Sequence, residues 1–148
     1  CEAAEIECSI VPGITAASAA VAAIGQSLTR RQRNASVKFL TGHDMHGFHE
    51  QEWQALAQPN TVAAIYMGKK SARFIQGRLL MHGADPKTPI SIVEYASLPH
   101  QRIIEARLDN LAETLRAQSV SGPALTLFGL PARKAALQIE NQHAKVSA

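Results

Sequence analysis

The chain has 148 residues, of which 46% are hydrophobic and 18% charged, and its net charge is +3. This composition excludes a disordered or fibrous protein, and the length predicts one domain with a sizeable core. Every apolar run meets a charged residue before it reaches the roughly 20 residues of a membrane span, so we expect a soluble protein with no membrane contact.

The predicted elements alternate between strands and helices along the chain. The strands are predicted at residues 5–11, 36–42, 61–68, 89–95, 101–108 and 123–129. The helices are predicted at residues 12–25, 50–58, 70–83, 109–118 and 130–148, with Gly25 and Gly83 ending two of them and Asp109 capping a third. This order favours an α/β fold, a three-layer sandwich with a mixed, mostly parallel sheet of five to six strands.

The start of the chain suggests a piece of a longer protein. Residue 1 is Cys1 rather than Met, and the first predicted strand begins without a preceding element. We therefore expect residues 1–148 to be one C-terminal domain without its N-terminal partner domain. Two cysteines, Cys1 and Cys8, are too few for a disulfide framework, which favours a reducing cytoplasm.

Ligands of such sheets gather where strands end, which directs attention to residues 11–16, 41–44, 66–70, 94–97 and 128–131. The helix after Pro12 begins with small residues, among them Thr15 and Ala16. These fit either tight packing against the sheet or a ligand lying on the first-turn N–H groups. Met67, at the end of a predicted strand, is either core or a flat contact for an aromatic ring such as adenine.

Several other chemistries are not supported by the motifs. The Gly-Lys at 68–69 lacks the glycine of a nucleotide-binding loop, because Ala63 stands there. His43, His46 and His49 recur every third residue, but no further metal-binding pattern accompanies them, and we expect no metal site.

Catalytic groups are equally sparse. Among carboxylates only Asp44 and Glu94 stand near predicted strand ends, and no nucleophile motif is present. We therefore expect a binding half without a catalytic residue of its own.

Basic residues are concentrated in one part of the chain. No acidic residue lies between Glu7 and Asp44, whereas Arg30, Arg31 and Arg33 fall within that span. Such a cluster is either a solvated turn or a surface for an anion, which could be a polycarboxylate, a phosphate or a nucleic acid.

Five short motifs, in order, resemble the tetrapyrrole methylase family. They are Val-Pro-Gly-Ile-Thr-Ala at 11–16, Leu-Thr before Arg31, Thr-Gly-His at 41–43, Tyr-Met-Gly at 66–68 and Pro-Ala-Leu at 123–125. Together they span about Ile6 to Pro131, and they are most similar to the C-terminal domain of the family's uroporphyrinogen-III C-methyltransferases.

The resemblance implies an activity and its partners. It implies methyl transfer from S-adenosylmethionine, leaving S-adenosylhomocysteine, to uroporphyrinogen III at C2 and C7. The product would be precorrin-2, for sirohaem or cobalamin synthesis. The cleft would lie between two α/β domains of a homodimeric enzyme, with the catalytic residues in the N-terminal domain and this chain inactive alone.

The resemblance also assigns residues. Thr15, Ala16, Met67, Ala96 and Ala124 would contact the cofactor, and Arg30 and Arg31 the carboxylates of the substrate.

The sequence departs from the family pattern at two of these positions. Arg30 stands where a His is common, and Ala96 replaces a Gly.

Two alternatives remain. A methylase of this fold could act on a later precorrin or on ribosomal RNA, or the basic turn could belong to a non-catalytic nucleic-acid-binding domain. The low aromatic content of 5% disfavours nucleic-acid binding.

Overall fold

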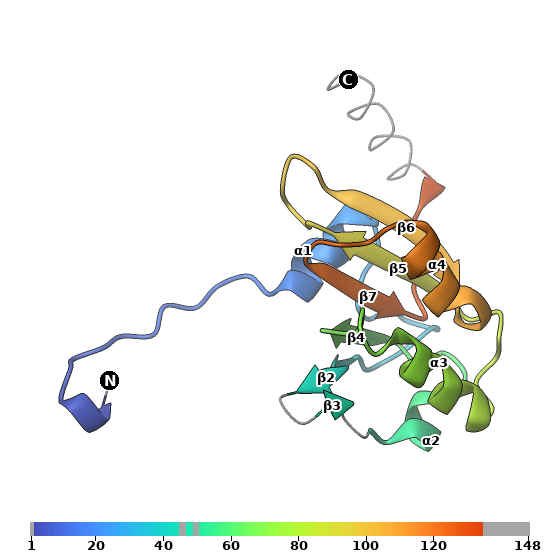
Figure 1. The fold of residues 1–148 in the computed structure, drawn as a ribbon, viewed down its shortest axis with the longest axis horizontal. Coiled ribbons are helices and arrows are strands. Elements are labelled where there is room, and N and C mark those ends of the chain that lie inside the picture. The colour runs from blue at the N-terminus through green and yellow to red at the C-terminus, as the bar shows by residue number, and fades with distance from the viewer. Residues whose placement is uncertain (1, 45–46, 49–50, 135–148) are drawn as a thin grey trace.

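The computed structural model describes residues 2–44, 47–48 and 51–134 (Figure 1). Cys1 and most of the helix predicted at 130–148 lie outside these residues. The strands are β1 (Lys38–Thr41), β2 (His43–Asp44), β3 (Gly47–Phe48), β4 (Ala63–Tyr66), β5 (Pro89–Glu94), β6 (Arg102–Arg107) and β7 (Ala124–Phe128). The helices are α1 (Ala16–Ala23), α2 (Trp53–Leu56), α3 (Ala72–Met81) and α4 (Leu111–Ala117), with 3-10 turns η1 (Glu2–Ala4) and η2 (Leu108–Asn110).

Five strands form one mixed sheet in the order β1-β4-β7-β5-β6, while β2 and β3 form a separate small hairpin. The α/β class and the five-stranded mixed sheet are as predicted. The expectation of a mostly parallel sheet is wrong, because among the strands of the described residues only β1 and β4 pair in parallel. Two features cause this: a short loop without a helix joins β5 to β6, and β7 inserts between β4 and β5 in the opposite direction.

Helices cover both faces of the sheet, which confirms the three layers. On one face, Ala17 of α1 and Ile24, which follows that helix, pack in a cluster that includes Leu127. On the other face, α2, α3 and α4 bury a second cluster around Ile75 and Leu111. Successive side chains of a strand point to opposite faces of the sheet, and here helices cover both faces. The central strands are therefore largely apolar on both sides.

The helix ends follow local rules with one exception. Gly25 and Gly83 end α1 and α3 in the left-handed region, with φ of +66° and +83°, as predicted. The predicted cap at Asp109 is wrong, because η2 precedes α4 and Asn110 is the capping position. The Asp109 carboxylate instead pairs with Arg107 at 3.2 Å.

Residues 6–15 form an extended arm that leaves the body of the domain (Figure 1). The strand predicted at 5–11 is therefore wrong. A strand needs a neighbour for its N–H and C=O groups, and no described strand lies beside this segment. Its apolar side chains remain in solvent, with Ile10 96% exposed and Val11 82% exposed.

Candidate functional site

The strand directions bring several loops to one edge of the sheet. β1, β4 and β5 run toward this edge, whereas β6 and β7 start from it. The segments after Thr41, Tyr66 and Glu94 therefore lie at the same edge as the segment before Ala124. Residues 128–131, which sequence analysis grouped with them, lie at the opposite edge because β7 is antiparallel to β4 and β5.

A groove of about 750 Å³ opens at this edge. Its lining includes four of the five residues predicted to contact a cofactor, namely Ala16, Met67, Ala96 and Ala124. The rest of the lining is His43, Tyr66, Lys69, Lys70, Val93, Tyr95, Leu98, Ser121, Gly122, Pro123 and Leu125. No Asp or Glu is among these described lining residues. The volume falls within the range of about 300–1,000 Å³ that is typical of small-molecule sites.

Helix α1 meets the groove at its first residue. Ala16 is exposed there, whereas Ala17 is fully buried against the sheet. The Thr15 hydroxyl accepts from the Ser18 N–H at 3.2 Å, and the Tyr66 hydroxyl accepts from the Ala17 N–H at 3.1 Å. These two N–H groups are thus bonded within the chain, whereas a ligand lying at the first turn, at Thr15 and Ala16, stays a prediction. The small side chains of α1 let the helix pack closely against the sheet and leave space at its first residue.

Thr15 is the fifth predicted contact, and it lines a different depression. Its neighbours there include Ser18 and Ser97, the residue after Ala96. Thr15 acts in the structure as the N-cap of α1.

The loops after β1 and β4 touch through two glycines. A Cβ on Gly42 would come within 2.9 Å of the Gly68 Cα, so this approach requires glycine. The Gly42 N–H donates to the Tyr66 carbonyl oxygen at 2.7 Å. Met67, which stands between Tyr66 and Gly68 in the sequence, adopts φ of +50°, and its side chain is 59% exposed. Its thioether is therefore a surface group at the groove and not part of the core.

Glu94 holds the opposite wall of the groove. Its carboxylate is 1% exposed, accepts from the Gly122 N–H at 2.7 Å and pairs with the Arg102 guanidinium at 3.0 Å. The Tyr95 ring lies against Gly122, where a Cβ would fall 2.0 Å from a ring carbon. With both oxygens engaged, Glu94 serves to position the segment before β7.

A family model described as Tetrapyrrole (Corrin/Porphyrin) Methylases matches residues 1–112 of the chain. The chain belongs to the tetrapyrrole methylases. Its curated relatives include siroheme synthase of Pseudoalteromonas translucida (strain TAC 125), 41% identical over 125 residues that make up 84% of this chain and 26% of the relative. Siroheme synthase 1 of Aeromonas hydrophila subsp. hydrophila is 42% identical over 126 residues, 85% of this chain and 27% of the relative. The chain thus spans about a quarter of the length of these proteins.

Solved structures of methyltransferases share the fold. Uroporphyrin-III C-methyl transferase from Thermus thermophilus, complexed with S-adenyl homocysteine, superposes with a TM-score of 0.70 at 29% identity. The match covers 86% of this chain and 53% of that one. A cobalt precorrin-4 methyltransferase of cobalamin biosynthesis gives a TM-score of 0.77 at 22% identity, over 86% of this chain and 54% of that one, which shows a common fold.

In this tetrapyrrole methylase chain the two predicted substrate contacts lie apart from the groove. Arg30 and Arg31 are exposed and line a depression of about 580 Å³ formed by residues 29–35. None of these residues lines the groove. Burial and the nearby Arg30 lower the pKa of the Arg33 guanidinium, which donates to the Asn34 side chain at 2.7 Å. Arg33 is therefore part of the turn's own structure.

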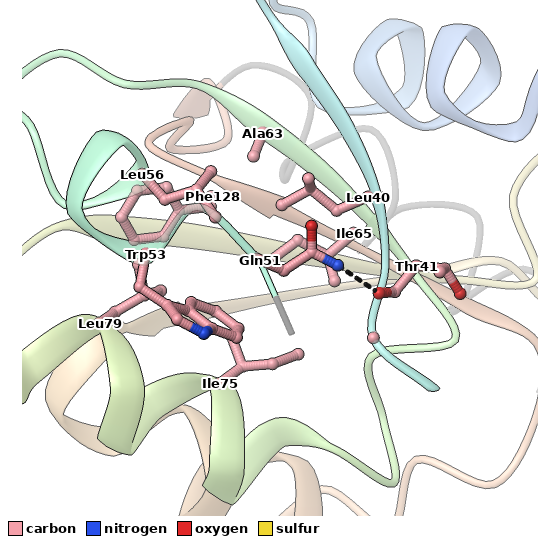
Figure 2. Close-up of a pocket in the computed structure, with 11 residues that line it drawn as sticks. Leu40, Thr41, Gln51, Trp53, Leu56, Ala63, Ile65, Ile75, Leu79 and Phe128 are labelled. Atoms are coloured by element: carbon pink, nitrogen blue, oxygen red, sulfur yellow. Dashed lines mark hydrogen bonds between the residues drawn. The ribbon is translucent and has the colours of Figure 1, made fainter. Parts of the chain in front are cut away.

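A small apolar pocket lies on the other face of the sheet, between the sheet and helices α2 and α3 (Figure 2). Trp53 and Ile75 point into it, and the Gln51 side-chain amide donates to the Thr41 carbonyl oxygen at 3.0 Å. Its volume is about 10 Å³. A single water needs about that much space, so the cavity is a packing space and not a ligand site.

Within the described residues no group of three His, Cys, Asp or Glu side chains could hold a metal ion. His43 lines the groove, whereas His46, His49 and the side chain of Asp44 lie outside the described part. No described helix combines the length and the apolar character that crossing a bilayer would need.

Sequence reasoning missed four residues that shape the groove, namely Tyr66, Lys69, Tyr95 and Gly122. Tyr66, Lys69 and Tyr95 lie in the segments 66–70 and 94–97, where the predicted strand ends favour ligands, but the sequence assigns these three residues no role. Their side-chain partners come from segments far along the chain, so no local pattern identifies them.

Proposed function

We propose that this chain supplies one side of the cleft in which a tetrapyrrole methylase binds S-adenosylmethionine. The groove at the sheet edge carries the proposal, because it unites Ala16, Met67, Ala96 and Ala124 in one space of ligand size. The alanines leave room for a flat ring to approach, and the exposed Met67 thioether offers a polarisable surface for it. The similar Thermus thermophilus enzyme, in complex with S-adenyl homocysteine, supports the same ligand class.

We propose uroporphyrinogen III as the substrate, methylated at C2 and C7 to precorrin-2 for sirohaem or cobalamin synthesis. The likeness to siroheme synthases and to a uroporphyrin-III C-methyl transferase supports this choice. When bound, the cofactor supplies a methyl group on a sulfonium, which is already activated. The chain's own residues then have to bind and orient the cofactor and the substrate, so that a pyrrole carbon lies within attack distance of the methyl carbon.

We assign the substrate carboxylates to Arg30 and Arg31, whose planar guanidinium groups suit bidentate pairing. Their exposure leaves them accessible to a large anionic ring. Because they lie outside the groove, their role is separate from cofactor binding.

We further propose that a second methylase domain, preceding this one, completes the cleft and carries the catalytic residues. The described groove lining has no carboxylate, and the chain covers 53% of the similar methyltransferase. On this proposal the chain alone lacks activity. The active enzyme would be a cytoplasmic homodimer, and the open edges of β1 and β6 are candidate surfaces for pairing.

Calorimetric titration with S-adenosylhomocysteine tests the cofactor site. Ala16→Leu places a larger side chain at the exposed start of α1, inside the groove, and is expected to weaken binding at least about tenfold. Ala117→Leu makes the same change at the exposed end of α4 and should leave binding unchanged.

The titration is run on this chain and on an enzyme that includes a preceding methylase domain. Binding by either, lost with Ala16→Leu and kept with Ala117→Leu, supports the site. If neither binds while the fold is intact by circular dichroism, the proposal is wrong.

A further inference from the structure

The groove opens where two paired strands separate. The β4–β7 ladder ends at the pair Ile65 and Thr126. Beyond it, Met67 continues one side and Ala124 the other, and both line the groove. The distance between these two segments therefore sets the width available to a ligand.

Lys69 connects the two segments across this opening. Its Nζ donates to the Ser121 carbonyl oxygen at 2.5 Å and to the Gly122 carbonyl oxygen at 2.9 Å. Lys69 itself lies in the connection from β4 to α3, and its partners are more than 50 residues away in sequence. One half-buried side chain thus joins the loop after β4 to the segment before β7.

The segment before β7 is held from its other side by backbone and carboxylate groups. Glu94 accepts from the Gly122 N–H at 2.7 Å, and the Tyr95 N–H donates to the Pro123 carbonyl oxygen at 2.9 Å. Both of these contacts anchor the segment to β5. Lys69 makes the contacts that anchor it to β4, so the ammonium group fixes its position relative to Met67.

We propose that Lys69 is a positioning residue that sets the width of the groove through Ser121 and Gly122, an inference that rests on the proposed function of the groove. Its ammonium acts on the ligand indirectly, by holding Ala124 and Met67 at the spacing the adenosyl group requires. Ser121 is exposed, so water reaches its carbonyl oxygen when the Lys69 side chain is shortened or neutralised. Gly122 is buried, but its segment stays bonded to β5 through Glu94 and Tyr95, so the loss of Lys69 affects binding more than folding.

The test compares three variants of the chain, or of the two-domain enzyme if only that binds. Lys69→Met removes the ammonium and keeps the length of the side chain, Lys69→Arg keeps a donor, and Lys87→Met removes an exposed charge outside the groove. Because the two walls of the groove then lose their fixed spacing, Lys69→Met should weaken S-adenosylhomocysteine binding by about tenfold or more. Lys69→Arg should restore most of the affinity, and Lys87→Met should stay within about twofold of wild type.

Amide hydrogen exchange without ligand gives a second readout. In Lys69→Met the N–H groups of Gly122 and Tyr95 should exchange faster than in wild type, while the melting temperature stays close to that of Lys87→Met.

The outcomes separate the two proposals. If wild type does not bind S-adenosylhomocysteine, the proposed function fails, and unchanged exchange in Lys69→Met would then overturn the role of Lys69 independently. If wild type binds and Lys69→Met binds equally well, the role of Lys69 is refuted. It is also refuted if Lys87→Met weakens binding as much as Lys69→Met, because the loss of net charge and not the loss of position would then be responsible.

Discussion

Replacing Glu94 with Gln should destabilise the domain by about 2 kcal/mol, a value that follows from its two contacts. The buried carboxylate accepts from the Gly122 N–H and from the Arg102 guanidinium. A glutamine retains one acceptor oxygen for Gly122 but directs its NH₂ group toward Arg102, where donor meets donor. One charge-assisted hydrogen bond is lost, and such bonds contribute about 1.5–3 kcal/mol.

This loss of stability should stay below the value for breaking a fully buried ion pair, which is about 3–5 kcal/mol. The Arg102 side chain is 44% exposed, so water solvates its charge once the carboxylate is gone. For a domain of this size, a loss of about 2 kcal/mol corresponds to a fall in melting temperature of about 4–8 °C.

Urea unfolding followed by circular dichroism measures the effect. Glu105→Gln is the matched control, since Glu105 is exposed on the neighbouring strand β6 and its replacement should change stability by less than about 0.5 kcal/mol. If the two variants unfold at the same urea concentration, the contacts of Glu94 contribute no net stability and the reasoning is refuted.

Three further changes have defined outcomes. Gly122→Ala should lower the free energy of unfolding by about 1–3 kcal/mol, measured by thermal unfolding, because its Cβ meets the Tyr95 ring. In a Tyr95→Ala background most of that loss should disappear, and equal losses in both backgrounds would contradict the clash. Thr15→Ala should cost about 1 kcal/mol, because its hydroxyl caps α1; an unchanged urea midpoint would show that the cap contributes nothing. Replacing Arg30 and Arg31 together by Ala should raise the KM of the two-domain enzyme for its tetrapyrrole substrate. The affinity for S-adenosylhomocysteine should stay unchanged, because neither arginine lines the groove. An unchanged KM would show that neither arginine binds the substrate.

Local sequence patterns predicted most elements of the sheet and both glycine helix ends. Gly25 and Gly83 were identifiable because a left-handed residue after a helix is a local requirement. The strands at 38–41, 63–66 and 89–94 were identifiable because apolar runs bounded by turn residues are local as well. Which strands become neighbours depends on contacts far along the chain, and periodicity carries no information about it.

The same limit applies to the groove. Motif order directed attention to Ala16, Met67, Ala96 and Ala124, and the fold brings these four together. The residues that hold its walls could not be predicted, because each role depends on a distant partner. Lys69 is the clearest case, since its carbonyl partners become neighbours only after β7 has paired with β4.

The position of β7 has a consequence for how the domain folds during synthesis. It is the last of the described strands in sequence, yet it lies at the centre of the sheet, between β4 and β5. Until residue 128 has left the ribosome, each of these strands presents an unpaired edge, which is the kind of surface on which nascent chains aggregate. Both halves of the sheet must therefore wait for a strand of five residues before they can join.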